Sequence, residues 1–118
     1  MVQLPEVYQY FDYRKYLRDS YEAMREKNSR YSYRFIQEKT GIDPGFLVKV
    51  FNGQKNLTEK SVPGLAKLLK LNKRQTKYFT LLILFGRAKT DSEIKHYFEK
   101  LLSFTELGSK KITADLYE

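Results

Sequence analysis

The sequence contains no cysteine, only three prolines and six glycines, and no long apolar run. Without cysteine the chain has no disulfide, no thiolate zinc site and no cysteine nucleophile, and this composition fits a cytoplasmic setting. No segment approaches the roughly 18 uncharged apolar residues that a membrane span needs, and the N-terminus lacks the pattern of a signal peptide. There is also no glycine-rich phosphate loop, cluster of metal ligands or catalytic pair of carboxylates. We therefore predict no enzymatic activity, no cofactor, no metal, no membrane contact and no evident small-molecule ligand.

The residues that are present predict one folded domain. The chain has 118 residues, of which 42% are hydrophobic and 15% aromatic, enough for a real apolar core. No segment shows sustained alternation of apolar and polar residues, so we expect an all-α fold, a compact bundle of five to six helices. We expect the domain to span residues 8–105, and residues 106–118 to form a loose tail or the start of a second domain.

Capping residues predict where the helices begin. The expected N-caps are Asp12, Ser32, Asp43, Ser61, Asn72 and Thr90, the fourth within a helical region over 58–70. Gly41 ends the second helix, and Pro44 suits the first position of the third. The residues expected to face the core are Tyr13, Tyr16, Leu17, Tyr21 and Met24 in the first helix, Phe35 and Ile36 in the second, Phe46, Leu47 and Val50 in the third, and Ile94, Tyr97, Phe98, Leu101 and Leu102 in the sixth.

The surplus of positive charge lies in the middle of the sequence. Residues 1–29 and 78–118 each contain as many acidic as basic residues, whereas residues 30–77 contain eleven basic and three acidic ones, which accounts for the whole net charge of +8. The basic residues of this segment are Arg30, Arg34, Lys39, Lys49, Lys55, Lys60, Lys67, Lys70, Lys73, Arg74 and Lys77. A neutral–basic–neutral division favours a segment that binds a polyanion between two scaffolding parts, although a solvated basic face is the plain alternative.

Two short predicted helices joined by a glycine turn over 32–51 have the proportions of a helix-turn-helix. The stretch "SYRFIQEKTGIDPGFLVKVFNGQKNLTEKSVPGLAKLLKLN" resembles the Cro/phage-repressor type of this motif, with its core at 32–71. With "FDYRKYL" before it and "KYFTLLILFGRAKT" after it, the chain is similar over residues 8–105 to the N-terminal domain of a bacterial family of predicted transcriptional regulators. That resemblance implies a DNA-binding domain whose second motif helix enters the major groove of double-stranded DNA.

The resemblance also implies roles for particular residues. Those implied to face or contact phosphates are Ser32, Tyr33 and Arg34 at the start of the first motif helix, and Gln54, Lys55 and Asn56 in the following loop. Those implied to face the groove are Asp43, Gly45, Val48 and Lys49, with base readout falling on Lys49 and on Asp43 or Asn52. A homodimer is the expected route to specificity, because a single short helix reads few base pairs.

The sequence departs from the repressor pattern at two points. Gln37 stands where the class prefers alanine at the helix crossing, so we expect the two motif helices to pack further apart. Pro44, Gly45 and Val48 offer no bidentate hydrogen-bonding pair, which weakens sequence-specific recognition more than DNA binding itself.

Two other functions remain open on sequence grounds. One is a protein-interaction module that uses Val48 and Phe51 of the third helix, or the apolar fifth helix. The other is RNA binding, with exposed tyrosines stacking on single-stranded bases. At helical spacing, however, the ten tyrosines are more typical of an amphipathic core.

Overall fold

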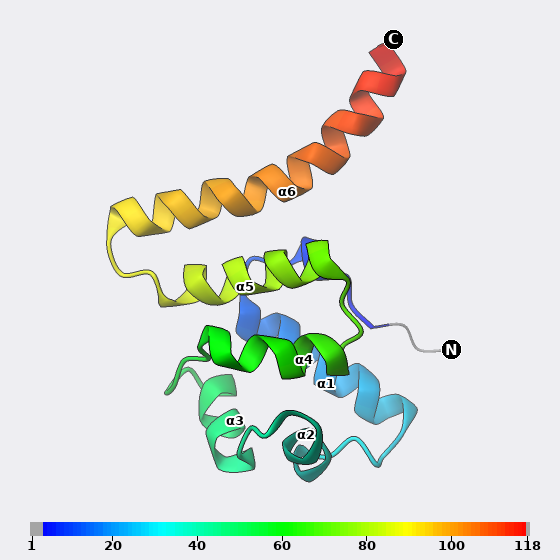
Figure 1. Ribbon diagram of the computed structural model, residues 1–118, viewed down its shortest axis with the longest axis vertical. Helices are drawn as coiled ribbons and strands as arrows, with labels where there is room; N and C mark the ends of the chain where they lie inside the picture. Colours follow the sequence, from blue (N-terminus) through cyan, green and yellow to red (C-terminus); the bar gives the residue numbers. More distant parts are fainter. Residues whose placement is uncertain (1–3, 118) are drawn as a thin grey trace.

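The computed structural model describes residues 4–117, with side-chain burial for residues 4–105. The elements are η1 (Val7–Gln9), α1 (Tyr13–Lys27), α2 (Tyr33–Thr40), α3 (Pro44–Phe51), η2 (Glu59–Ser61), α4 (Val62–Leu68), α5 (Lys73–Arg87) and α6 (Asp91–Tyr117). The described part of the chain contains no strand, which confirms the predicted all-α fold. Figure 1 shows α2 and α3 at one end of the molecule and the antiparallel pair α5 and α6 at the other, with α1 and α4 between them.

Five of the six predicted caps form hydrogen bonds at helix starts. The carboxylate of Asp12 accepts from the backbone N–H groups of Arg14 and Lys15. Ser32, Asp43, Asn72 and Thr90 each accept, through a side-chain oxygen, from the backbone N–H three residues later. Ser61 precedes α4 as expected but forms no such bond, because it is the last residue of η2 and has a helical backbone conformation instead of the extended one of an N-cap.

The core is centred on α5, as its apolar composition predicts. Four of its side chains, Tyr78, Phe79, Leu82 and Ile83, are completely buried. All five predicted core residues of α1 are buried as well. Phe35 and Phe46 were expected in the core but are only half-buried, because α2 and α3 are short and lie at the edge of the bundle.

Helix α6 differs from its prediction in two respects. Leu101 is buried, but Ile94 and Phe98 each remain 40% exposed, because α5 covers only one side of α6. The helix also continues through residues 106–117, where a loose tail was expected. That stretch is polar, but it contains no proline and only one glycine, and the strong helix formers Leu, Lys, Glu and Ala occupy half of it.

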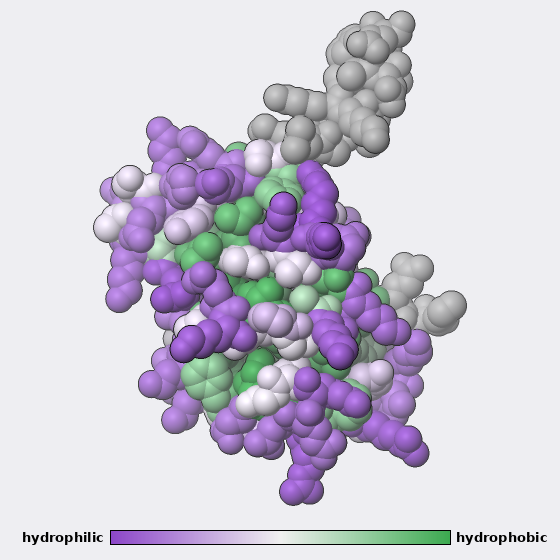
Figure 2. All heavy atoms as spheres, in the orientation of Figure 1, coloured by the Kyte–Doolittle hydropathy of each residue, from purple (hydrophilic) through white to green (hydrophobic). Residues whose placement is uncertain are grey.

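In the described part of the chain, no helix has the length and apolar character needed to cross a membrane. On the face shown in Figure 2, hydrophilic residues dominate the end formed by α2 and α3, and apolar residues gather towards the middle.

Candidate nucleic-acid interface

Helices α2 and α3 are joined by a tight three-residue turn. Gly41 has a φ of 79°, a left-handed conformation that favours glycine, and its N–H donates to the carbonyl of Gln37 at 2.7 Å. Ile42 is buried beneath the turn, and Asp43 caps α3. Figure 1 shows α2 almost end-on while α3 lies across the view, so the two axes cross steeply. Two short helices that cross steeply after a tight glycine turn agree with the proportions expected for a helix-turn-helix.

The structure removes the reason for expecting a wide crossing of the motif helices at Gln37. Gln37 is exposed, so its side chain does not lie between helices. The close approach is instead between α2 and α4, where a Cβ atom on Gly64 would lie 3.2 Å from the Cα atom of Thr40. The absence of a side chain at Gly64 therefore allows α4 to pack closely against the C-terminal end of α2.

Helix α3 has one buried and one exposed side. Leu47 and Val50 are 2% and 0% exposed. The exposed residues Gly45, Val48, Lys49 and Asn52 recur at the three- and four-residue spacing of one helix face. We call these four residues the α3 stripe. It contains all the residues that the sequence implied to face the groove, apart from the cap Asp43, whose Oδ2 accepts from the N–H of Phe46.

The loop after α3 is fixed by its backbone. Gly53 has a φ of 79°, and the N–H groups of Gln54 and Lys55 donate to the carbonyl of Lys49 at 2.8 and 3.3 Å. Leu57 is completely buried, and its N–H donates to the hydroxyl of Tyr13 at 3.1 Å. The side chains of Gln54 and Lys55 thus extend into solvent from a rigid loop.

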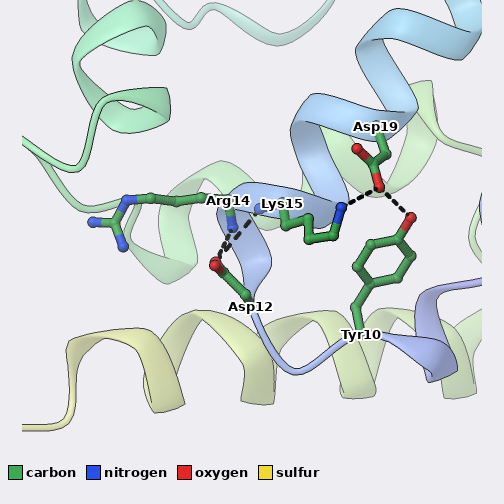
Figure 3. Close-up of polar contacts among 5 residues, drawn as sticks. All are labelled: Tyr10, Asp12, Arg14, Lys15 and Asp19. Atoms are coloured by element: carbon green, nitrogen blue, oxygen red, sulfur yellow. Dashed lines mark hydrogen bonds and ion pairs between the residues drawn. The ribbon is translucent and has the colours of Figure 1, made fainter.

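Two arginines of α1 hold the C-terminal end of α3, a contact that the sequence analysis missed. Arg14 donates through Nε to the carbonyl of Val50 at 2.8 Å and through Nη2 to the carbonyl of Lys55 at 3.0 Å. Arg18 donates to the carbonyl of Phe51 at 2.7 Å. These cations donate to carbonyls in the last turn of α3 and in the loop after it, and they complement the negative end of the helix dipole. Figure 3 shows the guanidinium of Arg14 extending away from the cap at Asp12.

Internal contacts occupy some of the predicted DNA-binding residues. The Oδ1 atom of Asn56 accepts hydrogen bonds from Arg14 and Tyr13, so Asn56 anchors the loop. Tyr33 stacks on Tyr21 with ring centroids 4.8 Å apart, and burial raises its pKa. The hydroxyl of Ser32 accepts from Phe35 at the cap. At the start of α2, Arg34 remains exposed and available.

All eleven basic residues of the middle segment are exposed, and none of them forms an ion pair within the described side chains. Of the three acids in this segment, Glu59 pairs with Arg87 at 3.6 Å. Arg74 is exposed but makes internal contacts: its guanidinium donates to the carbonyl of Phe104 and lies over the Tyr8 ring. Arg74 is therefore less available to a ligand than the other basic residues of the segment. The remaining exposed cations give this part of the molecule a net positive surface.

A cleft of about 410 Å³ between α1 and the end of α3 has mixed charge. It is lined by Asp12, Arg14, Lys15, Arg18, Asp19, Phe51, Asn52 and Gly53. Asp19 accepts from the Tyr10 hydroxyl at 2.7 Å and pairs with Lys15 at 3.3 Å (Figure 3), and the hydrogen bond from Tyr10 lowers the pKa of Asp19. Asp12 and Asp19 beside the arginines make this cleft a poorer phosphate site than the exposed loop after α3.

The tyrosines pack as amphipathic core residues. Among residues 4–105, every tyrosine is buried or half-buried, so this part of the chain offers no fully exposed tyrosine for stacking on bases. Comparisons with known proteins give no further guide, since no family model, no curated protein and no solved structure matches the chain. The similarity to Cro-type repressors therefore stays a prediction.

Proposed function

We propose that this domain binds double-stranded DNA without catalysis, with the α3 stripe in the major groove and the loop after α3 on the phosphate backbone. The observation that carries the proposal is the steep α2–α3 pair whose outer helix presents an exposed stripe beside unpaired cations. The major groove, about 12 Å wide, admits one α-helix.

The chemistry of the stripe limits what it can read. The amide of Asn52 can form the bidentate pair with adenine, and the ammonium of Lys49 can donate to guanine O6 and N7. Val48, which is 37% exposed, suits contact with a thymine methyl group. Gly45 places no side chain at the first position of the α3 stripe, so the backbone can approach the DNA closely there. Such a short set of readers favours modest specificity per domain, with a second copy supplying a second half-site.

The phosphate contacts have a separate source. Lys55 and Gln54 extend from a loop that α1 already holds, and Arg34 extends from the start of α2. Serine caps and helix N-termini add neutral donors to such contacts. Affinity should come mainly from the release of counterions, so it should fall steeply as salt increases.

The test is a fluorescence-anisotropy titration of a labelled duplex at several salt concentrations, with single-stranded DNA and RNA for comparison. Lys49→Gln and Lys55→Gln should each weaken duplex binding, and Lys55→Gln should reduce the slope of log K against log salt by about 0.9. Lys95→Gln is the matched control, because it removes the same charge from α6, where Lys95 pairs only with the exposed Glu99.

If Lys95→Gln weakens binding as much as the other two variants, binding follows net charge and the interface is wrong. An absence of duplex binding at low salt, or a clear preference for single strands, would contradict the proposal outright.

A further inference from the structure

A second surface lies between α5 and α6, at the end of the molecule opposite α2 and α3 (Figure 1). It is a groove of about 410 Å³ lined by Lys77, Thr80 and Leu81 of α5 and by Lys100, Ser103 and Phe104 of α6. Each helix contributes residues at the same three- and four-residue spacing, so the groove follows the seam between two packed helices.

The floor of this groove is largely apolar. Leu81 and Phe104 are half-buried and pack against the core. The two hydroxyls of the lining are already used within their own helices: Thr80 donates to the carbonyl of Thr76 at 2.9 Å, and Ser103 donates to that of Lys100 at 2.7 Å. The lining therefore offers a partner an apolar contact and few free hydrogen-bond donors apart from its lysines.

The rim of the groove is positively charged on both sides. Lys77 and Lys100 are both exposed. Among the described side chains, no carboxylate lines the groove and neither lysine forms an ion pair. Two cations facing an apolar floor are complementary to a ligand that carries carboxylates on either side of a bulky apolar residue.

We propose that this groove binds an acidic amphipathic helix of a partner protein. The apolar face of that helix would pack on Leu81 and Phe104, and its flanking Asp or Glu residues would pair with Lys77 and Lys100. The site is independent of the DNA-binding proposal, and its position permits both ligands to bind at once.

A second copy of this chain fits the groove less well. A two-fold contact would bring the lysines of the two copies together, and opposed like charges disfavour an interface. Nucleic acid would use the lysines but would leave Leu81 and Phe104 without an apolar partner.

The experiment is a selection of helical peptides from a display library against the whole chain. The selected peptides should carry bulky apolar residues at helical spacing flanked by Asp and Glu. The amide resonances that shift on peptide binding should be those around Lys77, Leu81, Lys100 and Phe104. The double variant Lys77→Glu/Lys100→Glu should weaken binding by about tenfold or more, because it replaces attraction by repulsion at two exposed positions. Lys95→Glu, on the same helix but outside the groove, is the control.

Three results would overturn the proposal. The selection could yield no peptide that binds the natural chain better than the double variant, or the double variant and the control could lose the same affinity. The amide resonances that shift on peptide binding could also be confined to α2 and α3. A duplex DNA titration that shifts the same α5 and α6 resonances would also overturn it, since the groove would then be a nucleic-acid contact.

Discussion

Arg14 holds the end of α3 and the following loop onto α1, so replacing it should destabilise the fold and weaken the DNA binding that we propose. Arg14→Met keeps a long side chain of similar helix propensity but removes hydrogen bonds to Val50, Lys55 and Asn56. Partly exposed bonds of this kind contribute roughly 1 kcal/mol each. Because about 1 kcal/mol of side-chain entropy is regained, the net loss in free energy of unfolding should be about 2 kcal/mol.

The assay is urea denaturation followed by circular dichroism. With an m-value of about 2 kcal/mol per molar urea, the midpoint should fall by about 1 M. Hydrogen exchange should also accelerate at the amides of Gln54, Lys55 and Leu57, whose bonds depend on the position of the loop.

Arg25→Met is the matched control, because Arg25 lies on the same helix and forms one hydrogen bond, to the hydroxyl of Tyr21 at 3.0 Å. It should cost less than about 0.5 kcal/mol. Equal losses for the two variants would refute the role assigned to Arg14, as would a stable Arg14→Met protein with unchanged exchange in the loop.

Three further predictions concern stability. Gly86→Ala should lower the melting temperature, because the new Cβ would lie 2.7 Å from two ring carbons of the fully buried Tyr13. Overpacking of this kind costs about 1–3 kcal/mol, which should exceed the gain of about 1 kcal/mol in helix propensity. An unchanged melting temperature would contradict this prediction. Ser20→Ala should raise the melting temperature, because the completely buried Ser20 hydroxyl lies near the Tyr16 hydroxyl but forms no hydrogen bond of good geometry in the described structure; a lower melting temperature would show that the contact with Tyr16 stabilises the fold. Alkaline pH should unfold the protein, because burial raises the pKa of three tyrosines to about 12: Tyr10, Tyr16 and Tyr78. Their stabilisation is complete below pH 10, the usual tyrosine pKa, and is lost as the pH rises through 12; tyrosinate absorbance and helical content should therefore change together, and titration of all tyrosines near pH 10 without unfolding would be inconsistent with it.

Local chemistry explains what could be predicted from the sequence. A cap such as Asp12 or Asn72 acts on amides within three residues, so the starts of α1 and α5 follow from neighbouring residues alone. The inward face of α1 follows similarly from helical spacing, and all five residues expected there are buried.

Contacts between distant residues explain what could not be predicted. Arg14 and Val50 are 36 residues apart, and nothing in the sequence near either residue indicates that one caps the helix of the other. Likewise, Ile94 and Phe98 lie on an apolar face of α6, but their exposure depends on how much of α6 the neighbouring α5 covers. Asn56 belonged to the predicted phosphate loop, and only the fold shows that its Oδ1 is committed to α1.

The rigid loop after α3 has a consequence for the thermodynamics of binding. Because hydrogen bonds to Lys49, Tyr13 and Arg14 already order this loop in the free protein, little conformational entropy remains to be lost when a ligand meets it. Calorimetry should therefore lack the large negative heat-capacity change of a segment that folds on binding. Association should also proceed without a slow ordering step, so that its rate is governed by charge and by diffusion.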